Sequence, residues 1–431
     1  MEKKLARELM KFIDESPSAF HAVKTSKDML NRAGFKELNE GERWNLDKQG
    51  KYYFSKNQSS LIAFVVGKGD IQKEGFRLIG AHTDSPTFKI KPKAEIKVEN
   101  SYLKLNTEGY GGAILNTWFD RPLSIAGRVM VKGKSLLKPE SMLVNIEKPL
   151  LIIPNLAIHM NRNVNEGYSI NKQKDTLPLA GLINEKFEEK DYLLNILSES
   201  LKVAKGDILD FDLFLYESEK SCLVGMEEEF ISASRLDDLW MVHSGIKALI
   251  ESKGSEETKV MICTDNEEIG SFTSQGADSS YVTTVLERIA LSLSKDKEEF
   301  YIALSNSVMM SADLAHALHP NQTGKHDPTN RPVLGRGPVL KSAAAGSYST
   351  DAYSASIFKG ICTKLKIPNQ SFVNRSDMRG GTTIGPMMAS RLLVPVIDMG
   401  APVLAMHSIR ELAATVDNKY IMELFKGFYN Q

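Results

Sequence analysis

Residues 78–86, LIGAHTDSP, carry an apolar run that stops abruptly at His82 and is followed by Asp84 and a Ser-Pro break. Together with the preceding residues the run reads GFRLIGAH, a short apolar segment typical of a strand buried on both faces. A strand that ends in His-Thr-Asp indicates either an ordinary surface turn or a ligand site at its carboxyl end. The rest of the chain has to distinguish these alternatives.

Similar apolar runs occur on both sides of this stretch and alternate with helical patterns. Strands are predicted in SSLIAFVVGKG (59–69), TKVMICTD (258–265), YIALSNSVMMSAD (301–313) and RLLVPVIDMG (391–400), and helices in RLDDLWMVHSGIKALIES (235–252) and SASIFKGICTKLKI (354–367). Such alternation is typical of an α/β fold with a mainly parallel sheet covered by helices on both faces. Ligands of open sheets of this kind bind at the carboxyl ends of the strands.

The pattern of apolar and polar residues changes in the middle of the chain. Segments such as FKIKPKAEIKVEN (88–100), GRVMVKGK (127–134) and DFDLFLYE (210–217) alternate apolar and polar residues, which indicates strands with one solvent-facing side. A helix is expected within residues 182–201. We therefore expect an α/β catalytic domain formed by residues 1–89 and 229–431, interrupted by an inserted β-rich domain at 90–228.

Composition excludes several classes of protein. The 431 residues include 54 Lys and Arg and 54 Asp and Glu, so the chain has no net positive charge that would attract nucleic acid or an anionic membrane. The three cysteines form neither a metal spacing nor a disulfide framework, which favours a reducing cytoplasm. The N-terminus is amphipathic, unlike a signal peptide, and no apolar run reaches the length of a membrane span.

Polar side chains follow several of the apolar segments. His82, Asp313 and His407 come after such runs, the series Asp265-Asn266-Glu267-Glu268 follows another, and Asp237 and Asp238 begin a helix. Each alone is explained by a turn, a helix cap or a structural histidine. Their coincidence at strand ends, without a thiolate, suits zinc, manganese or cobalt. Asp84, two residues after His82, could orient the imidazole of a metal-binding histidine.

Long motifs extend this pattern over almost the entire chain. They include SPSAFHAV (16–23), RLIGAHTDSP (77–86), YGGAILNTWFDRPLSIAGRV (110–129), IPNLAIHMNR (153–162), EFISASRLDDL (229–239), CTDNEEIGS (263–271), SADLAHALHPN (311–321), RSDMRGGTTIGP (375–386) and AMHSIRELA (405–413). In this order they resemble the aspartyl aminopeptidase family of cocatalytic zinc aminopeptidases, in particular its bacterial members. The resemblance implies a three-layer α/β/α catalytic domain with a mixed, mainly parallel sheet, an inserted oligomerisation domain and a homododecamer.

The resemblance also implies a role for each site residue. His82 and Asp313 are expected to hold one of two divalent metal ions, Glu268 and His407 the other, and Asp237 to bridge them. Glu267 is the expected general base and later acid, acting on a hydroxide held between the metals. Both glutamates can face the site only if the backbone leaves the strand near Asp265, because neighbouring strand residues point to opposite faces.

Substrate contacts are implied at three further positions. His159 of the inserted domain is expected to reach the substrate in a neighbouring subunit. Lys341 and Tyr348, in GPVLKSAAAGSYSTD (337–351), match positions suited to an acidic substrate side chain, although Gly346 and Ser347 replace a polar pair of the relatives. The changed loop favours a preference that extends from acidic to neutral N-terminal residues. A solvated surface position explains Lys341 equally well.

Other residues have plainer interpretations. His316 and His319, three residues apart, could share a helix face and support the site. His326 lies in a Pro/Asn-rich loop, and the glycines of RGGTTIGP (379–386) either let backbone amides approach a substrate or only connect loop and helix. Two other functions remain open: a deacetylase or carboxypeptidase with the same dimetal site, and an inactive oligomeric scaffold.

Overall fold

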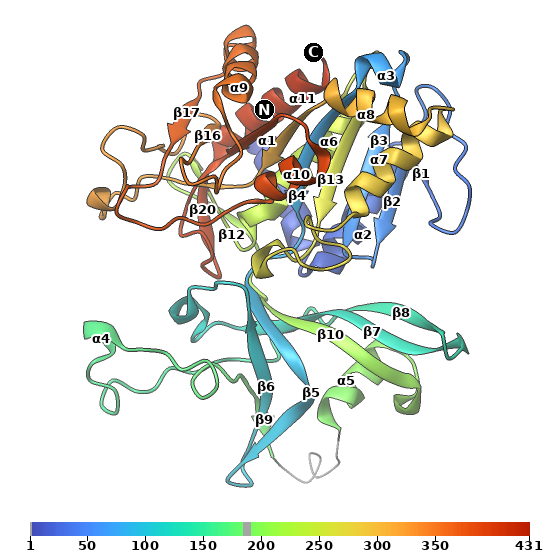
Figure 1. Ribbon diagram of the computed structural model, residues 1–431. Coiled ribbons are helices and arrows are strands. Elements are labelled where there is room, and N and C mark those ends of the chain that lie inside the picture. The colour runs from blue at the N-terminus through green and yellow to red at the C-terminus, as the bar shows by residue number, and fades with distance from the viewer. Residues whose placement is uncertain (1, 184–190) are drawn as a thin grey trace. The chain divides into compact units, whose positions relative to one another are not determined.

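The strand that ends at His82 lies in the middle of a nine-stranded sheet in the computed structural model, which describes residues 2–183 and 191–431 (Figure 1). The strand order is β1-β2-β3-β13-β4-β14-β18-β16-β17. The strands are β1 (Lys36–Glu37), β2 (Lys51–Lys56), β3 (Ser60–Val65), β4 (Phe76–His82), β13 (Thr258–Thr264), β14 (Val308–Ala312), β16 (Val339–Lys341), β17 (Gln370–Phe372) and β18 (Val396–Gly400). The neighbours β13, β4, β14 and β18 are mutually parallel, and antiparallel pairs join them to the outer strands. The predicted mixed, mainly parallel sheet is therefore confirmed, and the carboxyl ends of its four central strands share one edge.

Helices cover both faces of this sheet. One face packs against α1 (Glu2–Asp14), α2 (Ala19–Arg32), α6 (Leu236–Glu251), α9 (Ala352–Leu365) and α11 (Thr415–Tyr429), and the other against α3 (Ile71–Glu74), α7 (Tyr281–Ser292), α8 (Lys297–Ser305) and α10 (Ile384–Leu392). The alternation of strand side chains produces the two cores: Leu61 and Ala63 belong to the first, Ile62 and Phe64 to the second. The central strands are apolar on both faces because helices bury both.

The chain folds into two compact units. Unit 1 consists of Met1–Asp84, Ser221–Met406 and Glu411–Gln431, and unit 2 of Ser85–Lys220 together with His407–Arg410. Unit 1 also contains a second sheet of order β11-β12-β20-β19-β15. Its strands are β11 (Cys222–Val224), β12 (Phe230–Ala233), β15 (Ala315–His316), β19 (Pro402–Leu404) and β20 (Glu411–Ala414).

Unit 2 is built on a six-stranded antiparallel sheet of order β8-β7-β10-β5-β6-β9. The strands are β5 (Thr87–Val98), β6 (Tyr102–Tyr110), β7 (Leu123–Ser135), β8 (Lys138–Asn145), β9 (Leu179–Leu182) and β10 (Ile208–Glu217), and the helices are α4 (Val164–Gly167) and α5 (Tyr192–Leu201). Among the described residues of this unit, short 3-10 helices span Leu115–Trp118 and Lys205–Asp207. Within the range 182–201, where a helix is expected, α5 spans Tyr192–Leu201, and residues 184–190 lie outside the described part of the chain.

Two local predictions were wrong. The strand expected at 301–313 begins only at Val308, because α8 extends to Ser305 from a capping box formed by Asp296 and Glu299. His316 and His319 do not share a helix, since His316 ends strand β15, which pairs with β19. Among the described helices, none has both the length and the apolar character that crossing a membrane requires.

Candidate metal centre

His82 is held from three sides at the carboxyl end of β4. Its backbone N–H donates to Asp238 Oδ2 at 3.1 Å, and its Nδ1 lies 3.0 Å from the Asp84 carbonyl oxygen and 3.4 Å from Asp84 Oδ1. The other ring nitrogen, Nε2, lies 3.3 Å from Asp237 Oδ1. Contacts at Nδ1 thus orient the imidazole so that Nε2 faces the carboxylate of Asp237.

The glutamate pair occupies a turn directly after β13. This strand ends at Thr264, Asn266 has a left-handed backbone with φ 63°, and Glu267 begins a single 3-10 turn, Glu267–Ile269. Asparagine tolerates this conformation better than most residues. The Asp84 carboxylate accepts the backbone N–H groups of Glu267 and Glu268, each at 3.1 Å. The backbone therefore leaves the strand near Asp265, as expected.

Asp237 and Asp313 approach the same point from different elements. Asp237 lies in the first turn of α6, where its N–H donates to Glu411 Oε2 at 3.0 Å, and Asp313 follows β14 with its N–H bonded to the Met399 carbonyl at 3.0 Å. Potential ligand atoms of His82, Asp237 and Asp313 all lie within 4.8 Å of one another. An oxygen of Asp237 also lies within 4.8 Å of one of Glu268. Asp237 thus lies close to His82 and Asp313 and also to Glu268.

Negative charge is concentrated in this buried space. Burial alone would lower the pKa of His82, but the carboxylates of Asp237 and Asp84 outweigh it and raise that pKa well above its usual value. Burial also raises the pKa of Glu267 to about 8, and the neighbouring carboxylate of Asp313 adds to the increase. Both effects show that the site favours added positive charge.

The donor set fits zinc. Imidazole nitrogen and carboxylate oxygen are ordinary ligands of this ion, and a divalent cation would balance the clustered carboxylates. The polar supports behind the donors, namely Asp84, Asp238 and Glu411, match the hydrogen bonds that usually hold metal ligands in place. The residues present therefore fit the metal that the sequence predicts.

His407 belongs to unit 2 rather than unit 1. Its carbonyl accepts the N–H of Ile114 at 2.9 Å, and its Nδ1 lies 3.1 Å from the Gly112 carbonyl. A hydrogen bond from Nδ1–H to that carbonyl would leave Nε2 available as a ligand atom. Its role as a ligand stays a prediction.

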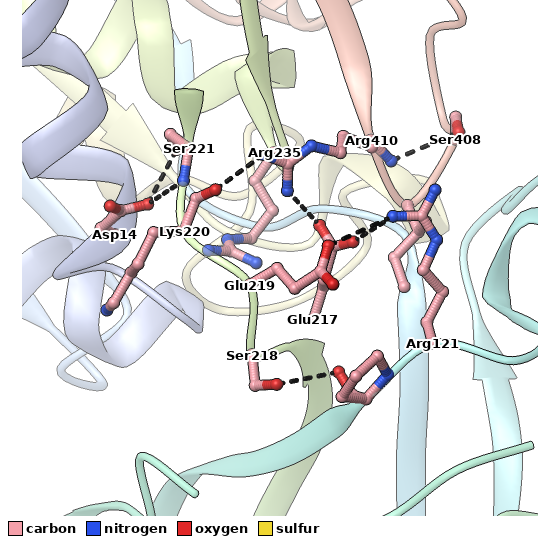
Figure 2. A network of polar contacts seen from close by, with 12 residues as sticks. Asp14, Arg121, Glu217, Ser218, Glu219, Lys220, Ser221, Arg235, Ser408 and Arg410 are labelled. Atoms are coloured by element: carbon pink, nitrogen blue, oxygen red, sulfur yellow. Dashed lines mark hydrogen bonds and ion pairs between the residues drawn. The ribbon is translucent and has the colours of Figure 1, made fainter. Parts of the chain in front are cut away.

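An ion-pair cluster around one buried glutamate anchors the segment that carries His407 (Figure 2). Glu217, whose side chain is fully buried, accepts from Arg121 Nη1 at 2.6 Å and from Arg410 Nη1 at 2.7 Å. Arg410 Nη2 also donates to the Lys220 carbonyl at 2.6 Å. These charge-assisted bonds hold Arg410, and with it the backbone three residues after His407, in place.

The predicted substrate contacts differ in their surroundings. Lys341 is buried, so its interpretation as a solvated surface residue was wrong; its Nζ lies 3.5 Å from Asp313 Oδ2 and 5.3 Å from the centre of the Tyr348 ring. The Asp313 carboxylate raises the pKa of Lys341 against the opposing effect of burial. His159 is exposed in a turn of unit 2.

Sequence reasoning missed three supports of the site. Nothing in the sequence relates Asp238 to the backbone of His82 or Glu411 to the backbone of Asp237. Nor does it relate the Asp84 carboxylate to Glu267 and Glu268, which follow it by 183 and 184 positions. Each bond depends on the folded arrangement of separate elements. The one available signal was the presence of acidic residues within otherwise apolar segments.

Comparison with known proteins gives consistent matches over the chain. Residues 12–429 match the aminopeptidase I zinc metalloprotease family (M18). A protein described as probable M18 family aminopeptidase 2, from Clostridium novyi (strain NT), is 57% identical over 427 residues, which cover 99% of each chain. A Clostridium acetobutylicum protein of the same description is 55% identical, covering 100% of this chain and 99% of its own.

Solved structures resemble the fold over nearly its full length. A chain in a cryo-EM structure of the Ape4 and Nbr1 complex is 36% identical with a TM-score of 0.94, covering 99% of this chain and 86% of its own. The S. cerevesiae mApe1 dodecamer is 28% identical with a TM-score of 0.86, covering 99% of this chain and 96% of its own. Sequence and fold point to the same group of proteins.

Proposed function

The chain belongs to the aminopeptidase I (M18) family of zinc metalloproteases, and from this premise we propose that it removes single N-terminal residues from peptides, acidic residues foremost and neutral residues as well. The observation that carries the proposal is the convergence of His82, Asp237 and Asp313 within 4.8 Å, beside the turn that presents Glu267 and Glu268. The donor set that fits zinc thus lies next to a carboxyl group suited to proton transfer.

We further propose two metal ions per subunit. His82 and Asp313 are the proposed ligands of one ion, Glu268 and His407 those of the other, with Asp237 shared. Zinc is the proposed metal, with manganese or cobalt as alternatives. When bound, such ions supply an activated water and a Lewis acid that polarises the scissile carbonyl.

The protein groups have separate tasks in this proposal. Glu267 takes a proton from the attacking water and delivers it to the departing amine, which requires a carboxyl group kept off the metals. Asp84 orients His82 and holds the turn of Glu267, through bonds of 3.0 and 3.1 Å. The buried carboxylates also attract the ammonium group of a free N-terminus, which favours removal of one residue at a time.

Substrate selection is assigned to three residues. Lys341 and Tyr348 are proposed to bind an acidic side chain of the N-terminal substrate residue. The Lys341 ammonium would then interact both with that side chain and with Asp313, whose Oδ2 lies 3.5 Å from Lys341 Nζ. His159 is proposed to reach the active site of a neighbouring subunit in a homododecamer. The free cysteines agree with a cytoplasmic location, which we also propose.

A substrate and metal screen tests the function. Aspartyl, glutamyl, alanyl and leucyl p-nitroanilides and N-acetyl-aspartate would each be assayed with zinc, manganese or cobalt. We expect the acidic nitroanilides to be hydrolysed fastest, N-acetyl-aspartate to remain intact, and a chelator to stop the reaction. Release of acetate without nitroanilide hydrolysis would instead support a deacetylase.

A further inference from the structure

A pocket of unit 1, with a volume of about 310 Å³, has six basic side chains in its lining and contains neither the predicted metal ligands nor Lys341 and Tyr348. Its basic lining residues are His316, His319, Lys325, His326, Arg375 and Arg379. The described lining residues include no carboxylate. We propose that this pocket binds a carboxylate of the peptide substrate on the departing side of the scissile bond.

The positive charge of the pocket is only partly balanced. Arg375 forms two contacts with Asp377, at 2.7 and 3.1 Å, and donates to the Gly324 carbonyl. Within the described residues, the Arg379 guanidinium has no hydrogen bond or ion pair, and the Lys325 ammonium interacts with Asp377 only at longer range. An anion entering the pocket would therefore meet two cations that have no close carboxylate of their own.

The histidines add hydrogen-bond donors to the pocket. Burial lowers the pKa of His326, and electrostatic interactions with His319 and Arg331 lower it further. A neutral imidazole can still donate one hydrogen bond to an anion. The pocket thus combines charged and neutral donors, a composition suited to a carboxylate and unsuited to a cation.

Backbone is also accessible in the pocket. Gly380 and Gly381 line it, and a Cβ added at Gly381 would meet no atom within 4 Å. A Cβ at Gly380 would instead collide with the Asn374 side chain. The space beside Gly381 is therefore open to a ligand, which supports the interpretation that these glycines let backbone amides approach the substrate.

The position of the pocket fits the departing part of a short peptide. His316 follows the predicted metal ligand Asp313 by three residues, so their Cα atoms are at most about 11 Å apart. An extended peptide advances roughly 3.3 Å per residue. The terminal carboxylate of a di- or tripeptide with its N-terminus at the metal centre would lie at a distance within this limit.

The inference rests on the proposed aminopeptidase function and specifies its substrate class. Peptides that carry a carboxylate beyond the scissile bond are the preferred substrates, and the carboxylate comes either from the C-terminus or from an acidic side chain. The N-terminal acidic side chain remains assigned to Lys341 and Tyr348, which line no part of this pocket.

The test compares peptides that differ only in this carboxylate. Asp-Ala-Ala, Asp-Ala-Ala-amide, Asp-Glu-Ala-amide and aspartyl p-nitroanilide would be hydrolysed by the metal-loaded wild type and by Arg379→Ala. We expect kcat/KM for Asp-Ala-Ala to fall about tenfold in the variant, with the amide and the nitroanilide unchanged. An equal loss for Asp-Glu-Ala-amide would identify a side-chain carboxylate as a second source of the same contact.

Matched variants separate charge from structure. Arg379→Lys should recover part of the loss, and Lys359→Ala, which removes an exposed lysine of α9 outside the pocket, should change nothing. Equal wild-type kcat/KM for Asp-Ala-Ala and its amide, or an equal loss on all four substrates in Arg379→Ala, would overturn the inference.

A binding measurement keeps the inference independent of turnover. Calorimetric titration of the metal-loaded Glu267→Gln variant, which is expected not to hydrolyse its ligands, should give tighter binding of Ala-Ala than of Ala-Ala-amide, and adding Arg379→Ala should abolish the difference. No discrimination between the two dipeptides would overturn the pocket assignment even if the wild type hydrolyses nitroanilides. Discrimination without any hydrolysis by the wild type would leave the pocket supported and refute the proposed function instead.

Discussion

Glu267 is the residue on which the proposed chemistry depends most directly. Glu267→Gln keeps the shape of the side chain but removes its ability to accept a proton. We expect kcat to fall by about 10² to 10⁴-fold, since that is the usual contribution of a general base. Metal content, measured by atomic emission on the purified protein, should equal that of the wild type. Full turnover with bound metal would show that another group transfers the proton.

His243 gives a residue-scale prediction for pH dependence. It is buried in α6 with its ring centre 5.3 Å from that of Phe12, and burial, helped by Lys247, lowers its pKa to about 3. Because the unfolded chain protonates this histidine near pH 6.5 and the folded one near 3, acid favours unfolding. The contribution of neutral His243 to the free energy of unfolding is complete above pH 6.5, and it should be smaller by about 2 kcal/mol at pH 5.

The measurement compares unfolding midpoints at pH 8 and pH 5. His243→Leu should lose less stability between these values than the wild type, whatever its stability at pH 8. The exposed His159 offers the control, because His159→Ala should retain the wild-type pH dependence of unfolding. An identical loss in His243→Leu and wild type would contradict the assignment.

At the scale of elements, the close approach of β18 to the end of β14 positions Asp313. A Cβ added at Gly400, the last residue of β18, would lie 1.7 Å from the Asp313 carbonyl oxygen. Gly400→Ala must therefore move the backbone of a proposed metal ligand. We expect weaker zinc binding, by tenfold or more in competition with a chromogenic chelator, and a lower unfolding midpoint.

Gly360 provides the matched control for this substitution. It lies in the exposed face of α9, and an added Cβ would meet nothing within 4 Å. Gly360→Ala should raise stability by about 0.5 to 1 kcal/mol, as expected for a helix interior, with unchanged zinc affinity. If Gly400→Ala also binds zinc like the wild type, the packing of β18 is not what holds Asp313.

The elements also show what the sequence could and could not predict. Apolar runs ending in polar residues predicted β4 and β13, because buried parallel strands have a distinctive composition. The alternation of strand side chains, together with the roles that the resemblance implies for Glu267 and Glu268, also predicted that the chain leaves β13 before Glu267. The burial of Lys341 and the bonds of Asp84 to the glutamate turn could not be predicted, since both depend on elements distant in sequence. The helix that replaces the start of the expected strand at 301–313 depends on a capping box further upstream.

At the scale of the whole molecule, the resemblance predicts shared active sites. Exposed His159 is expected to serve a neighbouring subunit, so His159→Ala should lose activity while keeping its metal content. Oligomers assembled from equal amounts of His159→Ala and Glu267→Gln subunits should recover up to about one quarter of wild-type activity, because that fraction of sites pairs two intact contributors. Light scattering would verify that the mixed particles are dodecamers. Mixtures that stay inactive would show that both residues act within one subunit.

The arrangement of the central strands also sets when this enzyme gains its activity. β4 is complete at residue 82, yet β14 lies between β4 and β18, and β18 ends at residue 400 of 431. The ribosome must therefore have translated residues 396–400 before β18 can pair with β14 at the sheet edge that gathers the proposed ligands. We therefore expect a nascent chain to lack peptide-cleaving activity until this late strand has been synthesised.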